Sequence, residues 1–150
     1  MAAVLIVAHA PLASALAGVA VHAYPECGAQ TVAVDVAREE APDDVARRVQ
    51  QALAALGGSD ILILTDVVGA TPHMGAWRAS ETLAKVRLVA GVNVPMLWRT
   101  LCYRHEALEQ LVARATDGGR LGIVQMASTR PANQGPSAWS HGQNPHHDQQ

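Results

Sequence analysis

Two polar side chains stand directly after apolar segments of the sequence. His9 follows the run VLIVA, and Asp66 follows the run ILILT. Such runs are typical of parallel strands covered on both faces, and reactive groups in parallel sheets collect at the carboxyl ends of the strands. If the two strands are neighbours, Asp66 can accept the Nδ1–H of His9, which leaves Nε2 free as a nucleophile. The alternative is that both are ordinary hydrogen-bonded loop residues.

The segment after Asp66 has the composition of an anion-binding turn. Gly69 permits a tight turn, and Thr71 is a candidate helix N-cap because a proline follows it at the first helical position. A hydroxyl group and free N–H groups at a helix N-terminus suit a phosphoryl oxygen. We therefore predict a phosphohistidine site with His9 as nucleophile, Asp66 as orienting carboxylate, and Gly69, Ala70 and Thr71 as the phosphate-binding turn. A capped turn without such a function is the alternative.

Other kinds of site have little support in the sequence. It contains neither a Walker motif nor the GxGxxG pattern, so we predict no nucleotide cofactor. Cys27 and Cys102 have neither disulfide nor zinc spacing and are predicted to be free thiols. Three histidines near the C-terminus offer only weak metal binding, and we predict no metal site.

Three segments of the chain resemble the IIA domain of the mannose-type sugar phosphotransferase system. They are AHAPLASAL at 8–16, TDVVGATPHMGA at 65–76 and GVNVPMLWRTLCYR at 91–104. They occur in the family's order and spacing, and the likeness covers about residues 1–127. The resemblance implies that His9 is phosphorylated, that Asp66 orients it and that Thr71 lies at the phosphate-binding turn. The chain departs from the family at Ala10, where Gly is common, and at 73–75, where an Asn-containing stretch is common, so loop shape and docking can differ.

The resemblance also implies partners and a fold. The donor would be the histidine-containing phosphocarrier protein, and the acceptor a IIB component in sugar uptake, which makes the protein a phosphotransferase. The implied fold is a parallel sheet with helices on both faces and a last antiparallel strand, here residues 120–126, that is exchanged between the subunits of a homodimer. Two other readings stay open: a regulatory module whose phosphorylation on His9 controls its partners, and a ligand-binding domain in which His9 and Asp66 are a structural pair.

The sequence pattern independently predicts a three-layer α/β fold with a mainly parallel sheet. The expected strands are residues 4–8, 31–36, 60–66, 85–91 and 120–126. Helical patterns cover residues 12–22 and 42–56, a third helix follows Thr71, and a fourth begins near Pro95 and is interrupted around Tyr103. The division into domains is a folded unit at 1–128 and a polar, His-containing, disordered tail at 129–150.

The composition excludes several classes of protein. The chain has 150 residues, of which 49% are hydrophobic and 16% charged, so it can bury the core of one domain. A net charge of −2 argues against nucleic-acid binding. No apolar run is long enough to span a bilayer, and the N-terminus does not have the pattern of a signal peptide. We therefore predict a cytoplasmic protein without membrane insertion.

The segment 95–104 has a second possible role. The simplest interpretation is a helix with one buried face, and the functional one is that Trp98, Arg99 or Arg104 helps to form a docking rim for partner proteins. Trp77 and Arg78 could contribute in the same way. His22, His73 and His105 are most simply helix residues at the surface or, for His73, at the pocket rim, and no role is assigned to them.

Overall fold

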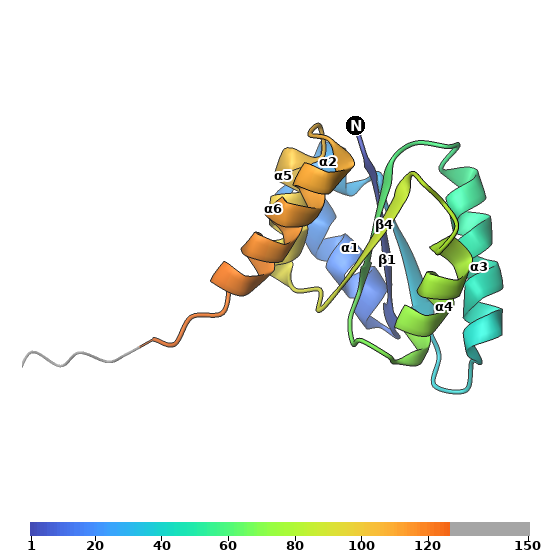
Figure 1. Ribbon diagram of the computed structural model, residues 1–150. Coiled ribbons are helices and arrows are strands. Elements are labelled where there is room, and N and C mark those ends of the chain that lie inside the picture. The colour runs from blue at the N-terminus through green and yellow to red at the C-terminus, as the bar shows by residue number, and fades with distance from the viewer. Residues whose placement is uncertain (127–150) are drawn as a thin grey trace, which may run out of the picture.

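The computed structural model describes residues 1–126, in which four strands alternate with six helices (Figure 1). The predicted tail, 129–150, lies outside the described residues. In chain order the elements are β1 (Ala3–His9), α1 (Leu12–Ala23), α2 (Pro25–Gly28), β2 (Thr31–Val36), α3 (Pro42–Ala55), β3 (Ile61–Thr65), α4 (Thr71–Ser80), β4 (Val86–Ala90), α5 (Val94–Tyr103) and α6 (Leu108–Leu121).

The sheet has the order β2-β1-β3-β4, and all of its neighbouring strands are parallel. Helices α1, α5 and α6 cover one face, and α3 and α4 cover the other, which confirms the predicted three-layer α/β fold (Figure 1). The central strands β1 and β3 are apolar along nearly their whole length because they are buried on both faces. Their carboxyl ends lie side by side, with Val7 opposite Thr65.

Alternate residues of the central strands belong to two separate cores. Val4, Ile6 and Ala8 pack with α1, α5 and α6, whereas Leu5 and Val7 pack with α3 and α4. The two-residue period of a strand therefore places the side chain of His9 on the face of Leu5 and Val7, at the edge of the α4 layer. This assignment matters for the site, because the turn between β3 and α4 lies at the same edge.

The predicted fifth strand, residues 120–126, is not present among the described residues. Helix α6 instead continues to Leu121, and residues 123–126 have no regular structure. The helix is held by close packing on α5, because a Cβ atom on Gly118 would lie 2.7 Å from Arg99 and one on Gly122 would lie 2.3 Å from Pro95. Beyond it, Ile123 is 80% exposed. Tertiary packing thus overrides the β-propensity of this segment, and a strand there would need a neighbouring strand that the described chain does not provide.

The helix starts follow the sequence signals, with one shift. The interruption expected around Tyr103 is confirmed, since α5 ends there and α6 begins at Leu108. Helix α4 is capped by Ala70, not Thr71, and Thr71 is its first residue. The proline therefore occupies the second helical position, where its missing N–H is also tolerated.

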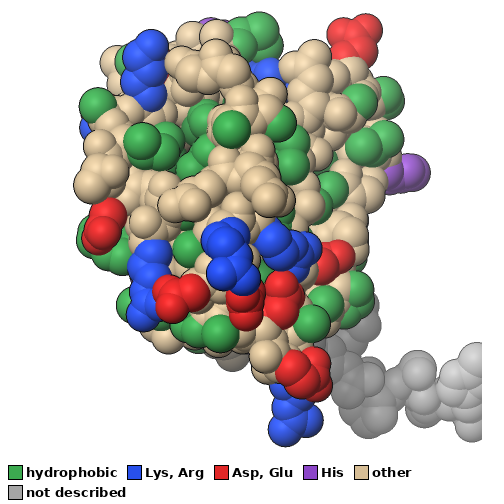
Figure 2. All heavy atoms as spheres, turned by 90° about the vertical axis from the view of Figure 1, so that its right-hand side faces the viewer, with side chains coloured by type: hydrophobic (Ala, Val, Ile, Leu, Met, Phe, Trp, Pro, Cys, Tyr) green, Lys and Arg blue, Asp and Glu red, His purple; other side chains and the backbone are tan. Residues whose placement is uncertain are grey.

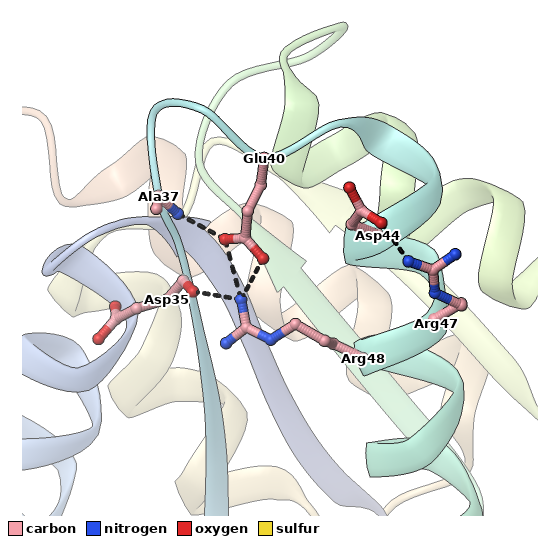
Figure 3. Close-up of polar contacts among 6 residues, drawn as sticks. All are labelled: Asp35, Ala37, Glu40, Asp44, Arg47 and Arg48. Atoms are coloured by element: carbon pink, nitrogen blue, oxygen red, sulfur yellow. Dashed lines mark hydrogen bonds and ion pairs between the residues drawn. The ribbon is translucent and has the colours of Figure 1, made fainter.

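A polar cluster fixes the loop between β2 and α3 (Figure 3). Arg48 of α3 donates to both carboxylate oxygens of Glu40, at 2.7 and 2.9 Å, and to the Asp35 carbonyl oxygen at 2.9 Å. Glu40 also accepts the Ala37 N–H at 2.7 Å. These N–H donors hold the pKa of Glu40 below its ordinary value. The cluster ties the carboxyl end of β2 to α3, beside the end of β1.

The outer surface of the α3 and α4 layer carries further ion pairs. Arg78 pairs with Asp43, and Arg47 pairs with Asp44. Figure 2 shows basic and acidic side chains next to one another on this side of the molecule. Because exposed pairs contribute only about 0–1 kcal/mol each, the burial of the core described above dominates the stability of this layer.

Close contact between α2 and α1 makes Gly28 a sensitive position. A Cβ atom there would lie 2.4 Å from the backbone of Ala20 and Val21, which cannot move independently of α1. We expect Gly28→Ala to lower the free energy of unfolding by about 2–3 kcal/mol, as measured by denaturant titration. Gly18→Ala is the matched control, because Gly18 lies in α1 and faces open space. This substitution should raise the free energy of unfolding by roughly 0.5–1 kcal/mol. Equal effects of the two substitutions would contradict the prediction.

Candidate functional site

His9 and Asp66 lie in contact at the carboxyl edge of the sheet. Nδ1 of His9 is 2.7 Å from Oδ2 of Asp66, and the same oxygen accepts the backbone N–H of His9 at 2.9 Å. The other oxygen, Oδ1, accepts the Val67 N–H at 2.8 Å. Two residues 57 positions apart meet here because β1 and β3 are neighbouring parallel strands. The carboxylate is thus fixed by backbone donors on both oxygens before it orients the imidazole.

The pair combines a buried carboxylate with an accessible ring. The Asp66 side chain is 10% exposed, and that of His9 is 49% exposed. Since Asp66 accepts at Nδ1, the ring proton lies on Nδ1 and the lone pair lies on Nε2. Within residues 1–126, no protein group forms a hydrogen bond to Nε2. The geometry therefore presents an oriented, available imidazole nitrogen.

The hydrogen bonds of Asp66 make stability depend on pH. Burial raises the pKa of its carboxyl group, but the bonds from the His9 N–H, the His9 ring and the Val67 N–H together lower it below its ordinary value. A lowered folded-state pKa stabilises the protein above about pH 4, and this stabilisation is lost as the pH falls through the folded-state value. We expect the free energy of unfolding of the wild type to fall more steeply than that of Asp66→Asn between about pH 5 and 2.5. Denaturant titrations across this range test it, and parallel curves would contradict it.

The turn after Asp66 leads directly into α4. Gly69 has a φ of 81°, which only glycine adopts readily, and the Ala70 N–H donates to the Val67 carbonyl oxygen at 3.2 Å. The Ala70 carbonyl oxygen accepts the Met74 N–H at 2.9 Å. Within residues 1–126, neither the Gly69 N–H nor the Thr71 N–H donates to a carbonyl oxygen of the turn. The structure thus places Gly69, Ala70 and Thr71 in one turn beside Asp66, with donors available at the helix N-terminus.

Further contacts that the sequence pattern did not reveal position the loop after His9. The Ala10 N–H donates to the Val36 carbonyl oxygen at 2.9 Å, and the Ser14 N–H donates to Oδ1 of Asp35 at 3.1 Å. Asp35 is thus an acidic partner for the N-terminus of α1. An acidic residue one position before the end of a β-strand, next to a helix start, was the signal available in the sequence.

The segment 95–104 divides between surface and core. Trp98 and Arg99 are exposed and line an open cavity of about 340 Å³ together with Tyr24 and Cys102. Arg104 is instead 7% exposed, and its guanidinium donates to the Cys27 carbonyl oxygen and to Gln30. The predicted place of Arg104 on a docking rim is therefore wrong, because the side chain joins α5 to the segment before β2. Cys27 and Cys102 are free thiols, as predicted.

Comparison with known proteins identifies the family. Residues 3–116 match the EIIA-man family, described as the PTS system fructose IIA component. The chain belongs to this family. It is also 34% identical over 87 residues to the mannose-specific EIIAB component of Escherichia coli K12, an alignment that covers 52% of this chain and 27% of that protein. The match thus spans about a quarter of the relative's length.

Two solved structures of phosphotransferase-system IIA proteins share the fold. The mannose/sorbose-specific IIA subunit from Enterococcus faecalis has a TM-score of 0.77 at 22% identity, covering 84% of this chain and 95% of that one. The phosphotransferase system component EIIA from Streptococcus agalactiae has a TM-score of 0.71 at 24% identity, covering 83% and 97%. Family membership supports a phosphotransfer role within the sugar phosphotransferase system.

Two kinds of feature are absent from residues 1–126. No helix there is long and apolar enough to cross a bilayer. Residues 1–126 also contain no group of three or more His, Cys, Asp or Glu side chains placed to hold a metal ion.

Proposed function

We propose that the protein is a phosphohistidine carrier that receives a phosphoryl group on Nε2 of His9 from the histidine-containing phosphocarrier protein. It passes the group on to a IIB partner in sugar uptake. The observation that carries the proposal is the 2.7 Å contact between His9 Nδ1 and Asp66, which leaves Nε2 as the free nitrogen of a half-exposed ring.

The transfer needs no change in the ring proton of His9. The Nε2 lone pair attacks the phosphorus atom of the donor's phosphohistidine, a new N–P bond forms, and the donor's N–P bond breaks with its electron pair left on the donor nitrogen. The proton on Nδ1 stays in place. Asp66 stabilises the positive charge that the ring gains, in the way that a carboxylate stabilises an imidazolium. Onward transfer to the acceptor repeats these events with His9 as the donor.

The turn at Gly69, Ala70 and Thr71 is the proposed binding site for the phosphoryl oxygens. The N–H groups of Gly69 and Thr71 are free within the turn and stand at the N-terminus of α4, where the helix dipole favours negative charge. Preorganised donors of this kind stabilise charge in a transferring group without any reorganisation during the reaction. In the proposed reaction, catalysis consists of positioning and electrostatic stabilisation.

The end of the described chain supports a homodimer. Leu121, Ile123, Val124 and Met126 are 71%, 80%, 68% and 87% exposed. Four apolar side chains in six residues are unusual on the surface of a monomer and mark an interaction site. We propose that these exposed apolar side chains contact a second copy of the chain. We propose that the protein acts in the cytoplasm.

The charging reaction tests the proposal. The protein is incubated with phosphoenolpyruvate, enzyme I and the phosphocarrier protein, and its intact mass is followed. We expect one added phosphoryl group that acid treatment removes. The absence of this addition, under conditions that charge the phosphocarrier, would overturn the proposal. Addition of IIB components then separates the two roles: loss of the label to IIB supports transport, whereas a label that every acceptor leaves in place supports a regulatory module.

A further inference from the structure

A second histidine lies on the same face of the sheet as His9. His73 is in the first turn of α4, and its Nδ1 is 3.3 Å from the Oγ1 of Thr65, the last residue of β3. Thr65 is fully buried and His73 is half-buried. Ala76, one turn further along α4, packs in the same core as Val7 of β1. His73 therefore extends from α4 down to the sheet, on the side where His9 lies.

The register of the strands brings the two histidines to one edge. Thr65 is paired with Val7, and His9 is two residues further along β1 on the same face. Neighbouring strands are about 4.8 Å apart and two residues span about 6.6 Å. The backbone of His9 thus lies about 8 Å from that of Thr65. The imidazole of His73 lies against Thr65, on the same face of the sheet as His9.

The two imidazole rings have different hydrogen-bond partners at Nδ1, and these partners favour opposite tautomers. For His9, a carboxylate accepts at Nδ1, so Nε2 holds a lone pair. For His73, the partner is a hydroxyl group that has no other hydrogen bond within residues 1–126. The buried hydroxyl satisfies its proton by donating to Nδ1, which places the ring proton of neutral His73 on Nε2. Nε2 of His73 is on the far side of the ring from Thr65, and no acceptor in the described chain receives its proton.

We propose that His73 is a phosphoryl-binding residue whose Nε2–H donates a hydrogen bond to an oxygen of the group carried by His9. The inference rests on the proposed phosphohistidine function and adds a side-chain donor to the backbone donors of the turn. His73 exchanges no proton in the step: it keeps the proton on Nε2 while the N–P bond forms at His9. Thr65 is the positioning residue that fixes the tautomer of His73.

Substitutions of His73 test whether an N–H donor at the position of Nε2 is what matters for charging. Glutamine can place an N–H donor where Nε2 stood, whereas phenylalanine keeps the ring and loses both nitrogens. A hydrogen bond to a charged group is a strong one, so we expect His73→Phe to slow the charging of His9 about 10- to 100-fold. His73→Gln should stay within about threefold of the wild type. Thr65→Val, which removes the hydroxyl group and keeps the side-chain shape, should give an intermediate loss.

The measurements are chosen so that the two proposals fail separately. Charging rates are measured with the phosphorylated phosphocarrier and with phosphoramidate, a small donor that needs no docking surface, and thermal melting confirms that each variant is folded. A wild type that the phosphorylated phosphocarrier does not charge overturns the proposed function. If the wild type is charged and a folded His73→Phe variant is charged as fast as the wild type by each donor, only the role of His73 is overturned.

A spectroscopic test addresses the tautomer without any activity assay. Long-range ¹H–¹⁵N spectra of the histidine-labelled protein, at a pH where imidazoles are neutral, distinguish a proton on Nε2 from one on Nδ1. We expect His73 to carry its proton on Nε2 and to lose this preference in Thr65→Val. A His73 ring protonated on Nδ1 in the wild type would overturn the inference, because the free nitrogen would then be an acceptor that repels the phosphoryl oxygens.

Discussion

Replacement of His9 by glutamine should abolish acid-labile phosphorylation completely. Glutamine places an amide near the position of Nε2 but offers no nitrogen lone pair, because the amide nitrogen's electrons are delocalised into its carbonyl group. The loss should therefore appear as absence of the label at every incubation time and not as a lower rate. Intact mass after incubation with the charged phosphocarrier measures it.

The matched control is His22→Gln. His22 is exposed in the last turn of α1 and has no hydrogen bond within the described residues, so its replacement should leave charging unchanged. A label that persists in His9→Gln and disappears in His22→Gln would show that His22, away from the sheet edge, is the phosphorylated residue. A label that persists in both would point to a histidine elsewhere in the chain, which has seven.

Most of the fold could be predicted because its signals are local. The runs at β1 and β3 are apolar at nearly every position, which indicates burial on both faces, and the spacing of the helices between them leaves a parallel sheet as the consistent arrangement. The meeting of His9 and Asp66 followed from the same reasoning, since both residues end strands. It required only that β1 and β3 be neighbours, and the structure has them so.

What could not be predicted depends on contacts between distant segments. The glycines of α6 permit its close approach to α5, and this packing extends the helix into residues whose types favour a strand. Arg104 is exposed or buried according to where Gln30 and the Cys27 carbonyl oxygen lie, 74 and 77 residues earlier. His73 is similar: its position in a helix is readable from the sequence, but its bond to Thr65 depends on how α4 crosses the sheet.

Replacement of Asp66 by asparagine should slow phosphoryl transfer to His9 by about 10²- to 10⁴-fold while leaving the protein folded at neutral pH. Oδ2 of Asp66 accepts both the backbone N–H and the Nδ1–H of His9, and Oδ1 accepts the Val67 N–H, so the single amide oxygen of asparagine can serve only one of these two sides. With that oxygen toward Val67, the NH₂ group faces His9 and favours the tautomer in which Nδ1 of His9 has the lone pair and Nε2 has the proton. The attacking nitrogen is thereby blocked, and the charge that stabilises the imidazolium is removed in the same substitution.

Asp60→Asn provides the comparison, because it removes the same charge just before the opposite end of β3, where the side chain is exposed. Rapid-quench measurements with the charged phosphocarrier should show a normal rate for this variant and a large loss for Asp66→Asn. If both variants lost rate equally, the effect would be the overall charge of the protein acting on its donor. If neither did, the carboxylate would be a structural partner of His9, because a nucleophile whose tautomer is set by Asp66 cannot keep its rate when that partner becomes a donor.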